Sequence, residues 1–381
     1  MIQIRLILIL LLLGIAKQIN AQSTDNDLDF KGQLSTFGSY NFDSDLEFLF
    51  GGNFIPEVSY SIPLPKDHLF DFNGAANLNG SFGFHPFTQS NSTSNLSAYR
   101  LWTRYSGNQF EARLGLQKIN FGSASILRPL RWFDQVDPRD PLGITNGVWG
   151  LLGRYYFLDN TNIWAWVLYG NEDTKGWEQA NTNHKKPEFG GRVQWPVPKG
   201  EVAFTYHHRT ADARNLAFPT AFSEIAENRF GFDGKWDITV GFWIETTHST
   251  KTRNIGMFTN QTQFTVGTDY TFAVGNGLNI VAEHLFTSYD EKSFEFNNTQ
   301  NLTAITSSYP IGIFDQISTV LYFDWKAENF YSFFNYQRDL KHFTFYTMVF
   351  INPKNRGGFQ QNDLVNSYTS KGIQLMLAYN F

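Results

Sequence analysis

The segment 120–147 concentrates charged and aromatic side chains in a stretch that is too long for a simple connection between two strands. Its charges could set a transverse electric field across a narrow solute path, and its rings could stack on a sugar. Alternatively, the arginine–aspartate pairs only fix the shape of a cap on the outside of the molecule. The side chains concerned are Arg128, Arg131, Trp132, Phe133, Asp134, Asp137, Arg139 and Asp140.

A second set of arginines falls on one face of the alternating segments described below. Such a row could guide anionic solutes, because rings of arginine or lysine can select anions. Alternatively, these arginines balance acids on the same face (Glu111, Glu201, Glu245, Asp269 and Glu283) in a network that holds the wall in shape, and we favour this second interpretation. The set comprises Arg100, Arg104, Arg113, Arg154, Arg192, Arg209 and Arg229, and Gln117 shares the face.

Residue types that commonly carry catalysis are scarce or poorly placed. The chain has no cysteine, which excludes thiol catalysis, disulfides and thiolate metal sites. None of the eight histidines lies in a recognisable nucleophile motif, and His207 and His208 are neighbours on a strand, so their rings point to opposite faces. The sequence therefore predicts no enzyme and no cofactor. A hydrolase with a Ser–His couple at the rim of the fold, using His207, is the alternative.

The segment 70–84 shows most clearly which elements must position these side chains. Its even positions, from Phe70 to Phe84, are apolar or small with aromatic rings at both ends, and its odd positions are small or polar. A helix would mix the two sets, so the pattern predicts a strand with one lipid-facing side. The same alternation recurs at 99–105, 110–117, 189–195, 201–207, 264–272 and 373–381.

The predicted connections alternate in length, as in outer-membrane barrels. Short ones are expected at 63–68, 106–109, 158–161, 196–200, 273–277 and 325–329, and long ones at about 85–96, 120–147, 171–187, 210–227, 247–260 and 288–314. A spacing of roughly 20 residues per strand predicts an all-β, antiparallel transmembrane barrel of about 16–18 strands. A large soluble β-sandwich also alternates, but it does not explain aromatic strand ends or the asymmetry of the loops.

Composition supports the barrel. Aromatic residues make up 17% of the chain and charged residues only 17%, with a mean hydropathy of −0.31. No run of 18 apolar residues follows residue 21, and only helices and closed barrels satisfy the backbone in lipid. The formal net charge of −5 argues against nucleic acid as a partner.

Two features do not fit a simple alternation. If short and long connections alternate up to residue 351, then 342–351 and 371–381 run in the same direction. Either 352–370 hides a short strand, or an earlier strand is mispaired. Pro56 interrupts the pattern of Phe54, Val58 and Tyr60, and a closed sheet has no free edge for it. We expect a bulge there, or a strand that begins nearer Glu57.

Residues 1–21 are expected to be a cleaved signal peptide, because Arg5 precedes an apolar run of 11 residues that is too short to span a bilayer. Residues 22–381 would then form a single barrel domain.

Two segments resemble bacterial outer-membrane porins. The ending Leu375–Phe381 is similar to the C-terminal signal that the barrel-assembly machinery reads through the terminal phenylalanine. The segment 110–140 resembles a strand and loop of the alginate-export and phosphate-selective porin groups, through Arg113, Gly115 and Gln117 and a loop rich in proline, aspartate and aromatics. The Asn-Ala-Gln junction at 20–22 and the content of asparagine and phenylalanine resemble proteins of Bacteroidota.

This resemblance implies an outer-membrane location and a channel for diffusion of small hydrophilic solutes, with segment 120–147 folded into the lumen. It implies membrane lipid and the assembly machinery (through Phe381) as partners, and it is compatible with a homotrimer. A non-conducting barrel in a surface-assembly or secretion complex remains the alternative function.

Overall fold

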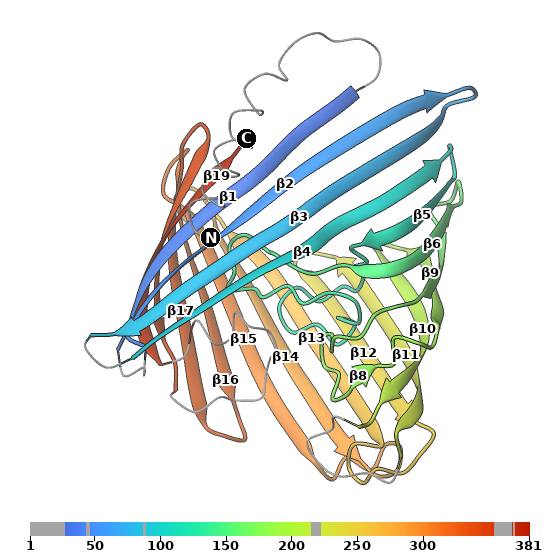
Figure 1. Ribbon diagram of the computed structural model, residues 1–381. Coiled ribbons are helices and arrows are strands. Elements are labelled where there is room, and N and C mark those ends of the chain that lie inside the picture. The colour runs from blue at the N-terminus through green and yellow to red at the C-terminus, as the bar shows by residue number, and fades with distance from the viewer. Residues whose placement is uncertain (1–26, 43–45, 87–88, 215–221, 354–367, 369) are drawn as a thin grey trace.

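The computed structural model describes residues 27–42, 46–86, 89–214, 222–353, 368 and 370–381 (Figure 1). Within these residues, eighteen of the nineteen strands form one antiparallel ring that closes between β1 and β19, and the two-residue β8 pairs only with the end of β10. The expected all-β barrel of about 16–18 strands is therefore confirmed. The strands are β1 (Asp27–Phe42), β2 (Phe48–Leu64), β3 (His68–His85), β4 (Gln89–Ser106), β5 (Phe110–Gln117), β6 (Val148–Tyr156), β7 (Asn162–Leu168), β8 (Asn181–Thr182), β9 (Glu188–Val197), β10 (Gly200–Asp212), β11 (Glu224–Asp237), β12 (Gly241–Lys251), β13 (Asn260–Phe272), β14 (Leu278–Asp290), β15 (Thr299–Pro310), β16 (Asp315–Asp324), β17 (Asn329–Asp339), β18 (Phe343–Ile351) and β19 (Lys371–Asn380).

Side chains on β3 separate by parity as the sequence predicts. Phe72 and Phe82 are exposed on the outer face of the ring, whereas Asp71, Asn73 and Asn77 are buried on the inner face. The apolar outside suits lipid and the polar inside suits water, which is the arrangement of a transmembrane barrel. Among the described residues, no helix is long and apolar enough to cross a bilayer.

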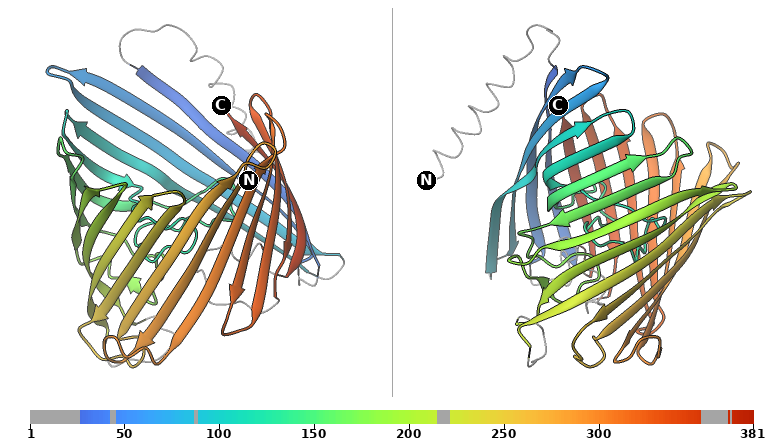
Figure 2. Two further views of the ribbon diagram at one scale, coloured as in Figure 1. Left: turned by 180° about the vertical axis from the view of Figure 1, so that it is seen from behind. Right: turned by 90° about the vertical axis from the view of Figure 1, so that its right-hand side faces the viewer.

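The connections differ in length between the two ends of the barrel (Figure 2). At one end, here called the short-connection end, between two and five residues join successive strands at 65–67, 107–109, 157–161, 198–199, 238–240, 273–277, 311–314 and 340–342. The opposite, long-connection end carries 118–147 and 169–187, the two connections that fold inward.

The prediction of one long loop at 288–314 was wrong, because this segment contains a strand. The missing strand explains why 342–351 and 371–381 were expected to run in the same direction. This strand is β15, whose alternation is masked in the sequence by a run of polar residues, Thr299–Asn301 and Thr303. Adding one strand moves the turn 325–328 to the long-connection end and lets β18 pair directly with β19. Of the two explanations offered from the sequence, an error in pairing an earlier strand is therefore the correct one. The ring needs no strand from 352–370. The predicted loops 85–96, 210–227 and 247–260 were also too long, because β4, β10, β11 and β12 extend into them.

Pro56 lies within β2 and does not end it. The strand runs from Phe48 to Leu64, so the expected start near Glu57 was wrong. Pro56 pairs with Gly32 of β1, while the ladder to β3 lacks the pairs of Ile55 and Pro56. A proline has no N–H to donate, which accounts for the interruption. The bulge lies one ladder further on, between β3 and β4 at Ala75/Ala76.

The seam between β1 and β19 is closed by the terminal residue. Phe381 donates its N–H to the carbonyl of Gly32 at 3.1 Å and accepts from the Gly32 N–H at 2.9 Å. Its ring lies among Phe30, Phe54 and Tyr379. A Cβ at position 32 would lie 2.6 Å from this ring, so glycine is required there by close approach.

Candidate functional site

The connection 118–147 lies inside the ring and reaches the wall opposite its own strands (Figures 1 and 2). Its apolar side packs against β6 and β7, where Ile119, Phe121 and Trp132 are buried with Leu152 and Trp166. Burial of this side against its own strands directs the backbone of 122–130 toward β11–β14. The segment therefore divides the interior and leaves its polar groups to be satisfied by inward-facing acids.

Two such acids hold the connection through its backbone. The Glu283 carboxylate on β14 accepts hydrogen bonds from the N–H groups of Ser125 (2.7 Å), Ile126 (3.0 Å) and Leu127 (2.5 Å). Glu245 on β12 accepts from the backbone of Ala124 and Leu130 at 2.9 and 2.5 Å. Carboxylates bonded to N–H groups form charge-assisted bonds stronger than neutral ones, so these two acids are the main anchors of the segment.

The arginines and aspartates of the connection mostly pair with one another. Arg128 donates to both oxygens of Asp134 at 2.8 and 3.0 Å, and Arg139 donates to both oxygens of Asp137 at 3.0 and 2.7 Å. Burial acts to lower the pKa of Arg128, but the adjacent Asp134 raises it overall. These bidentate pairs fix the local shape of the segment, as the second interpretation expected. The segment nevertheless lies inside the barrel, as the first interpretation expected.

Arg131 and Asp140 differ from these pairs. The Arg131 guanidinium lies 5.2 Å from the ring centroid of Trp177, and burial lowers its pKa. Asp140 accepts the N–H groups of Leu142 and Ile144, both at 3.0 Å, and burial raises its pKa. Trp132 is buried in the core of the connection, so it offers no open face there for a sugar.

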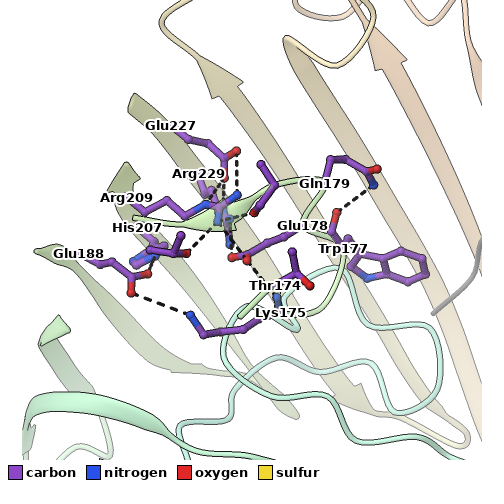
Figure 3. A network of polar contacts seen from close by, with 12 residues as sticks. Thr174, Lys175, Trp177, Glu178, Gln179, Glu188, His207, Arg209, Glu227 and Arg229 are labelled. Carbon is purple, nitrogen blue, oxygen red and sulfur yellow. Dashed lines mark hydrogen bonds and ion pairs between the residues drawn. The ribbon is translucent and has the colours of Figure 1, made fainter. Parts of the chain in front are cut away.

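The second inward connection, 169–187, completes an ion network with the wall (Figure 3). Glu227 on β11 accepts from Nε of Arg209 (2.9 Å) and from Nε of Arg229 (2.6 Å). Glu178 from the connection bonds Nη2 of Arg229 at 2.7 Å and Nη1 of Arg209 at 3.0 Å. Lys251 lies 3.3 Å from Glu227. The side chains of all members are buried, so this network ties the connection to β10–β12.

His207 is fully buried beside this network, away from any rim. The Trp166 indole N–H donates to Nδ1 of His207 at 3.2 Å, so the imidazole proton lies on Nε2, which faces Glu188 at 3.2 Å. Both ring nitrogens are occupied, and no serine hydroxyl contacts either of them among the described residues. The arrangement required for a hydrolase built on His207 is therefore not present at this position.

The remaining predicted arginines form a group on β4–β6, facing the interior. Glu111 lies 2.9 Å from Arg154, 3.6 Å from Arg104 and 3.8 Å from Arg113, and Arg104 also pairs with Asp71 at 2.7 Å. The guanidinium groups of Arg113 and Arg154 lie 4.6 and 3.7 Å from the rings of Trp102 and Trp164. These arginine side chains are only partly buried, unlike those of β9–β11.

Two further predicted residues tie β4 to the inward connection and β5 to β6. Arg100 on β4 donates from Nη2 to the carbonyl of Thr145 at 3.0 Å, which ties the end of the inward connection to the strand. Gln117 is fully buried and donates to the carbonyls of Arg113 and Gly150. On the other side, Arg192 pairs with Asp233 as a buried, bidentate ion pair. The predicted set is thus divided among the connection, the ion network, the β4–β6 arginines and the separate pair of Arg192 with Asp233.

Sequence reasoning missed the acidic and aromatic side chains of 169–187, and it also missed Asp233 on β11. Lys175, Trp177 and Glu178 all lie in a segment that was expected to be an external loop, and alternation gives no signal outside strands. The available signal was length, because a connection of this size is uncommon without a role. No group of three or more potential metal ligands occurs among the described residues.

No protein-family model matches the chain, and no curated protein matches it. Its structure is similar to that of OccAB4 from Acinetobacter baumannii, with a TM-score of 0.54 and 11% identity over 96% of this chain and 100% of that chain. It is also similar to OccK5 (OpdH) from Pseudomonas aeruginosa, with a TM-score of 0.55 and 12% identity over 93% of this chain and 98% of that chain. A mutant of the Rh. blastica porin aligns over 93% of this chain at 10% identity, but its TM-score of 0.47 adds no argument.

These likenesses extend over almost the whole chain and show a shared fold. Together with the closed ring, the apolar outside and the inward-folded connections, they define the class of the molecule. It has the fold of a porin-like transmembrane β-barrel.

Proposed function

We propose that this protein is an outer-membrane channel for diffusion of small hydrophilic solutes. The observation that carries the proposal is the connection 118–147, which is held inside a closed ring by Glu245 and Glu283. A segment fastened across the interior narrows a solute path without chemistry, which is what a diffusion channel needs. The OccAB4 and OccK5 likenesses support the barrel but not the solute.

The charge of the narrowed region favours anions. Three arginines (Arg104, Arg113 and Arg154) are grouped on β4–β6 around two carboxylates, those of Asp71 and Glu111, and Arg100 on β4 bonds a backbone carbonyl and no carboxylate of this group. The arginines of β9–β11 are instead buried in ion pairs that cancel their charge. A partly exposed excess of positive charge raises the local concentration of anions.

Reconstitution of the full chain in planar bilayers tests both statements. We expect discrete conductance steps and a reversal potential in a KCl gradient that shows anion preference. The double variant Arg113→Gln/Arg154→Gln should move the permeability ratio toward cations, whereas Arg338→Gln on the rim of β17 should not. Silent bilayers under all conditions would instead favour the alternative function, a non-conducting barrel in an assembly or secretion complex.

The remaining expectations concern processing and partners. The signal peptide 1–21 lies outside the described residues, and N-terminal sequencing of the mature protein tests it. Recognition of Phe381 by the assembly machinery and a homotrimer are proposals, to be tested by assembly of a Phe381→Ser variant and by native mass measurement. The alginate-export, phosphate-selective and Bacteroidota resemblances stay predictions.

A further inference from the structure

We propose that the unpaired edge of β4, residues 89–100, binds an extended, uncharged segment of another polypeptide by β-strand addition. β4 pairs with β3 from Gln89 to Ser106, but it pairs with β5 only from Leu101 to Ser106. Figure 1 shows β5 beside only the C-terminal part of β4. No other described strand pairs with residues 89–100 on that side. A binding surface of this kind goes beyond the proposed channel function.

The inward connection creates this edge. β5 ends at Gln117, because the chain then turns into the lumen, where Ile119 and Phe121 join the buried cluster on β6 and β7. A strand of 18 residues, β4, therefore lies beside a strand of 8. An antiparallel strand without a neighbour on one side leaves every second N–H and C=O on that side unpaired. The edge thus offers about six N–H groups and as many carbonyls.

The outer part of the edge lies where water reaches it. Residues 90–95 are all exposed, and their side chains are polar on both faces of the sheet. On the outward face, Ser90 and Ser92 pair with Phe84 and Phe82 of β3, aromatic residues of the kind that mark the level of the lipid headgroups. This level belongs to the long-connection end, which faces away from the cell in outer-membrane barrels. A segment of another polypeptide can therefore reach the edge from outside.

Nothing in the sequence of this edge blocks a further strand. Free edges of natural sheets usually carry lysine, proline or a bulge that prevents pairing. Residues 89–99 contain no charged residue and no proline, and the bulge in the ladder with β3 lies at the inner end, opposite Ala75 and Ala76. Near that end Leu96 and Ala98 are exposed on the outward face, where lipid cannot satisfy open N–H and C=O groups. A strand added along β4 would pair these groups.

A second copy of the chain fits this edge poorly. Two copies in one membrane are related by rotation about the membrane normal, so the vertical components of their β4 strands point the same way and the edges cannot align antiparallel. A segment of a different polypeptide has no such restriction. Serine and threonine side chains suit the added strand, because they can pair with the hydroxyls of Ser92 and Ser94 as Thr93 already pairs with Ser81 at 2.9 Å.

A labelled peptide that copies residues 90–98 is the probe, because it is uncharged, rich in serine and free to run antiparallel to β4. Fluorescence anisotropy with the detergent-solubilised full chain should show saturable binding. Two further peptides carry N-methyl groups on alternate residues, one on the even and one on the odd positions. An added strand uses only one of its edges, so one methylated peptide should bind more than about 10-fold more weakly, since each lost hydrogen bond costs about 2- to 10-fold. The other should bind like the unmodified peptide.

Variants of the barrel locate the binding. Ser92→Lys/Ser94→Lys puts two charges on the edge and should abolish binding of the unmodified peptide. The matched control is Thr250→Lys/Thr262→Lys, at the same end on β12 and β13, because both residues pair with a strand on each side. The chain has no cysteine, so Ser94→Cys introduces a single thiol. Oxidation should trap a peptide that carries a central cysteine on Ser94→Cys and not on Thr250→Cys.

Several results would overturn the proposal. Absence of binding to the wild-type barrel, equal binding of the two methylated peptides, or binding that the edge lysines leave unchanged each refutes strand addition at β4. Disulfide-linked barrel dimers of Ser94→Cys in lipid vesicles without peptide would assign the edge to a second copy instead. Unheated gel migration identifies folded barrel first, and the cysteine trap decides if the lysine variant does not fold. Conductance is not a readout, so failure of the channel proposal leaves this test unaffected.

Discussion

Glu283 should control how firmly the inner segment is held, and its removal gives the sharpest test of the proposed constriction. The carboxylate accepts three backbone N–H groups, those of residues 125–127, together with the Ser125 hydroxyl at 3.1 Å and the Trp243 indole N–H at 3.0 Å. Glu283→Ala removes the acceptor of all five donors, and three of these, on Ile126, Leu127 and Trp243, are buried. Glu283→Gln keeps one carbonyl oxygen but turns an NH₂ group toward backbone donors.

The magnitude follows from the type of bond lost. A hydrogen bond to a charged group contributes about 1.5–3 kcal/mol, and such values do not add within one site. Leaving a buried donor without an acceptor costs about 1–3 kcal/mol for each group. We therefore expect Glu283→Ala to weaken the closed position of 122–130 by about 3–5 kcal/mol and Glu283→Gln by roughly half as much. Glu245 and Thr265, which donates to the Leu127 carbonyl at 2.7 Å, still hold the segment.

Single-channel recording and limited proteolysis measure the result. Glu283→Ala should show larger and noisier conductance than wild type and faster cleavage within 118–147. The double variant Glu245→Ala/Glu283→Ala should show a larger increase in both conductance and cleavage rate. Glu57→Gln is the matched control, because Glu57 is an inward acid on β2 that bonds Asn73 and Lys31 and does not contact the segment. Unchanged conductance and unchanged cleavage in the double variant would refute the idea that this segment limits the path.

Three further predictions concern stability and assembly. Gly32→Leu should lower the yield of heat-modifiable folded barrel several-fold, because its Cβ would lie 2.6 Å from the C-terminal ring; Gly153→Ala, where the nearest atom is 4.0 Å away, should not. Asp137→Asn should destabilise the barrel by about 3 kcal/mol in urea unfolding, because it replaces a fully buried carboxylate that binds the Arg139 guanidinium through both of its oxygens. Burial raises the pKa of Asp140 above its ordinary value, so the folded state binds the Asp140 proton more tightly than the unfolded state does. The stability that this proton contributes is therefore lost as pH rises through the folded pKa. Asp140→Asn should make the urea midpoint of unfolding less dependent on pH between pH 4 and 7.

Side-chain parity made the barrel predictable, because lipid outside and water inside impose a period of two on every spanning strand. β3 shows this directly, with Phe72 outward and Asn73 inward. The same reasoning failed on β15, where Gln300, Asn301 and Thr303 make both faces polar. It also failed at Pro56, because the pairing with β3 is interrupted only at Ile55 and Pro56 and resumes in the same register at Glu57.

The candidate site was only half predictable for a different reason. Alternation indicates which arginines face inward, as Arg192 and Arg209 do, but not which acids they meet, because partners come from segments far apart in the chain. Glu178 meets Arg229 across 51 positions, and Glu283 meets Ser125 across 158. Such contacts depend on how a connection folds back into the ring, and nothing in local spacing encodes that path.

The two walls of the interior therefore serve different purposes, although both are rich in arginine. On β9–β11 the guanidinium groups are buried and paired, and the pair of Arg229 with Glu178 fastens the inward connection 169–187 to the wall. On β4–β6 they share Glu111, stack on tryptophan rings and stay partly exposed, so their charge reaches the interior. The two interpretations of the inward arginines, a row that guides anions and a network that holds the wall in shape, thus apply to different walls. Exposure and the ratio of acids to arginines decide, on each wall, whether the charge of an inward arginine is cancelled in an ion pair or stays open to the interior.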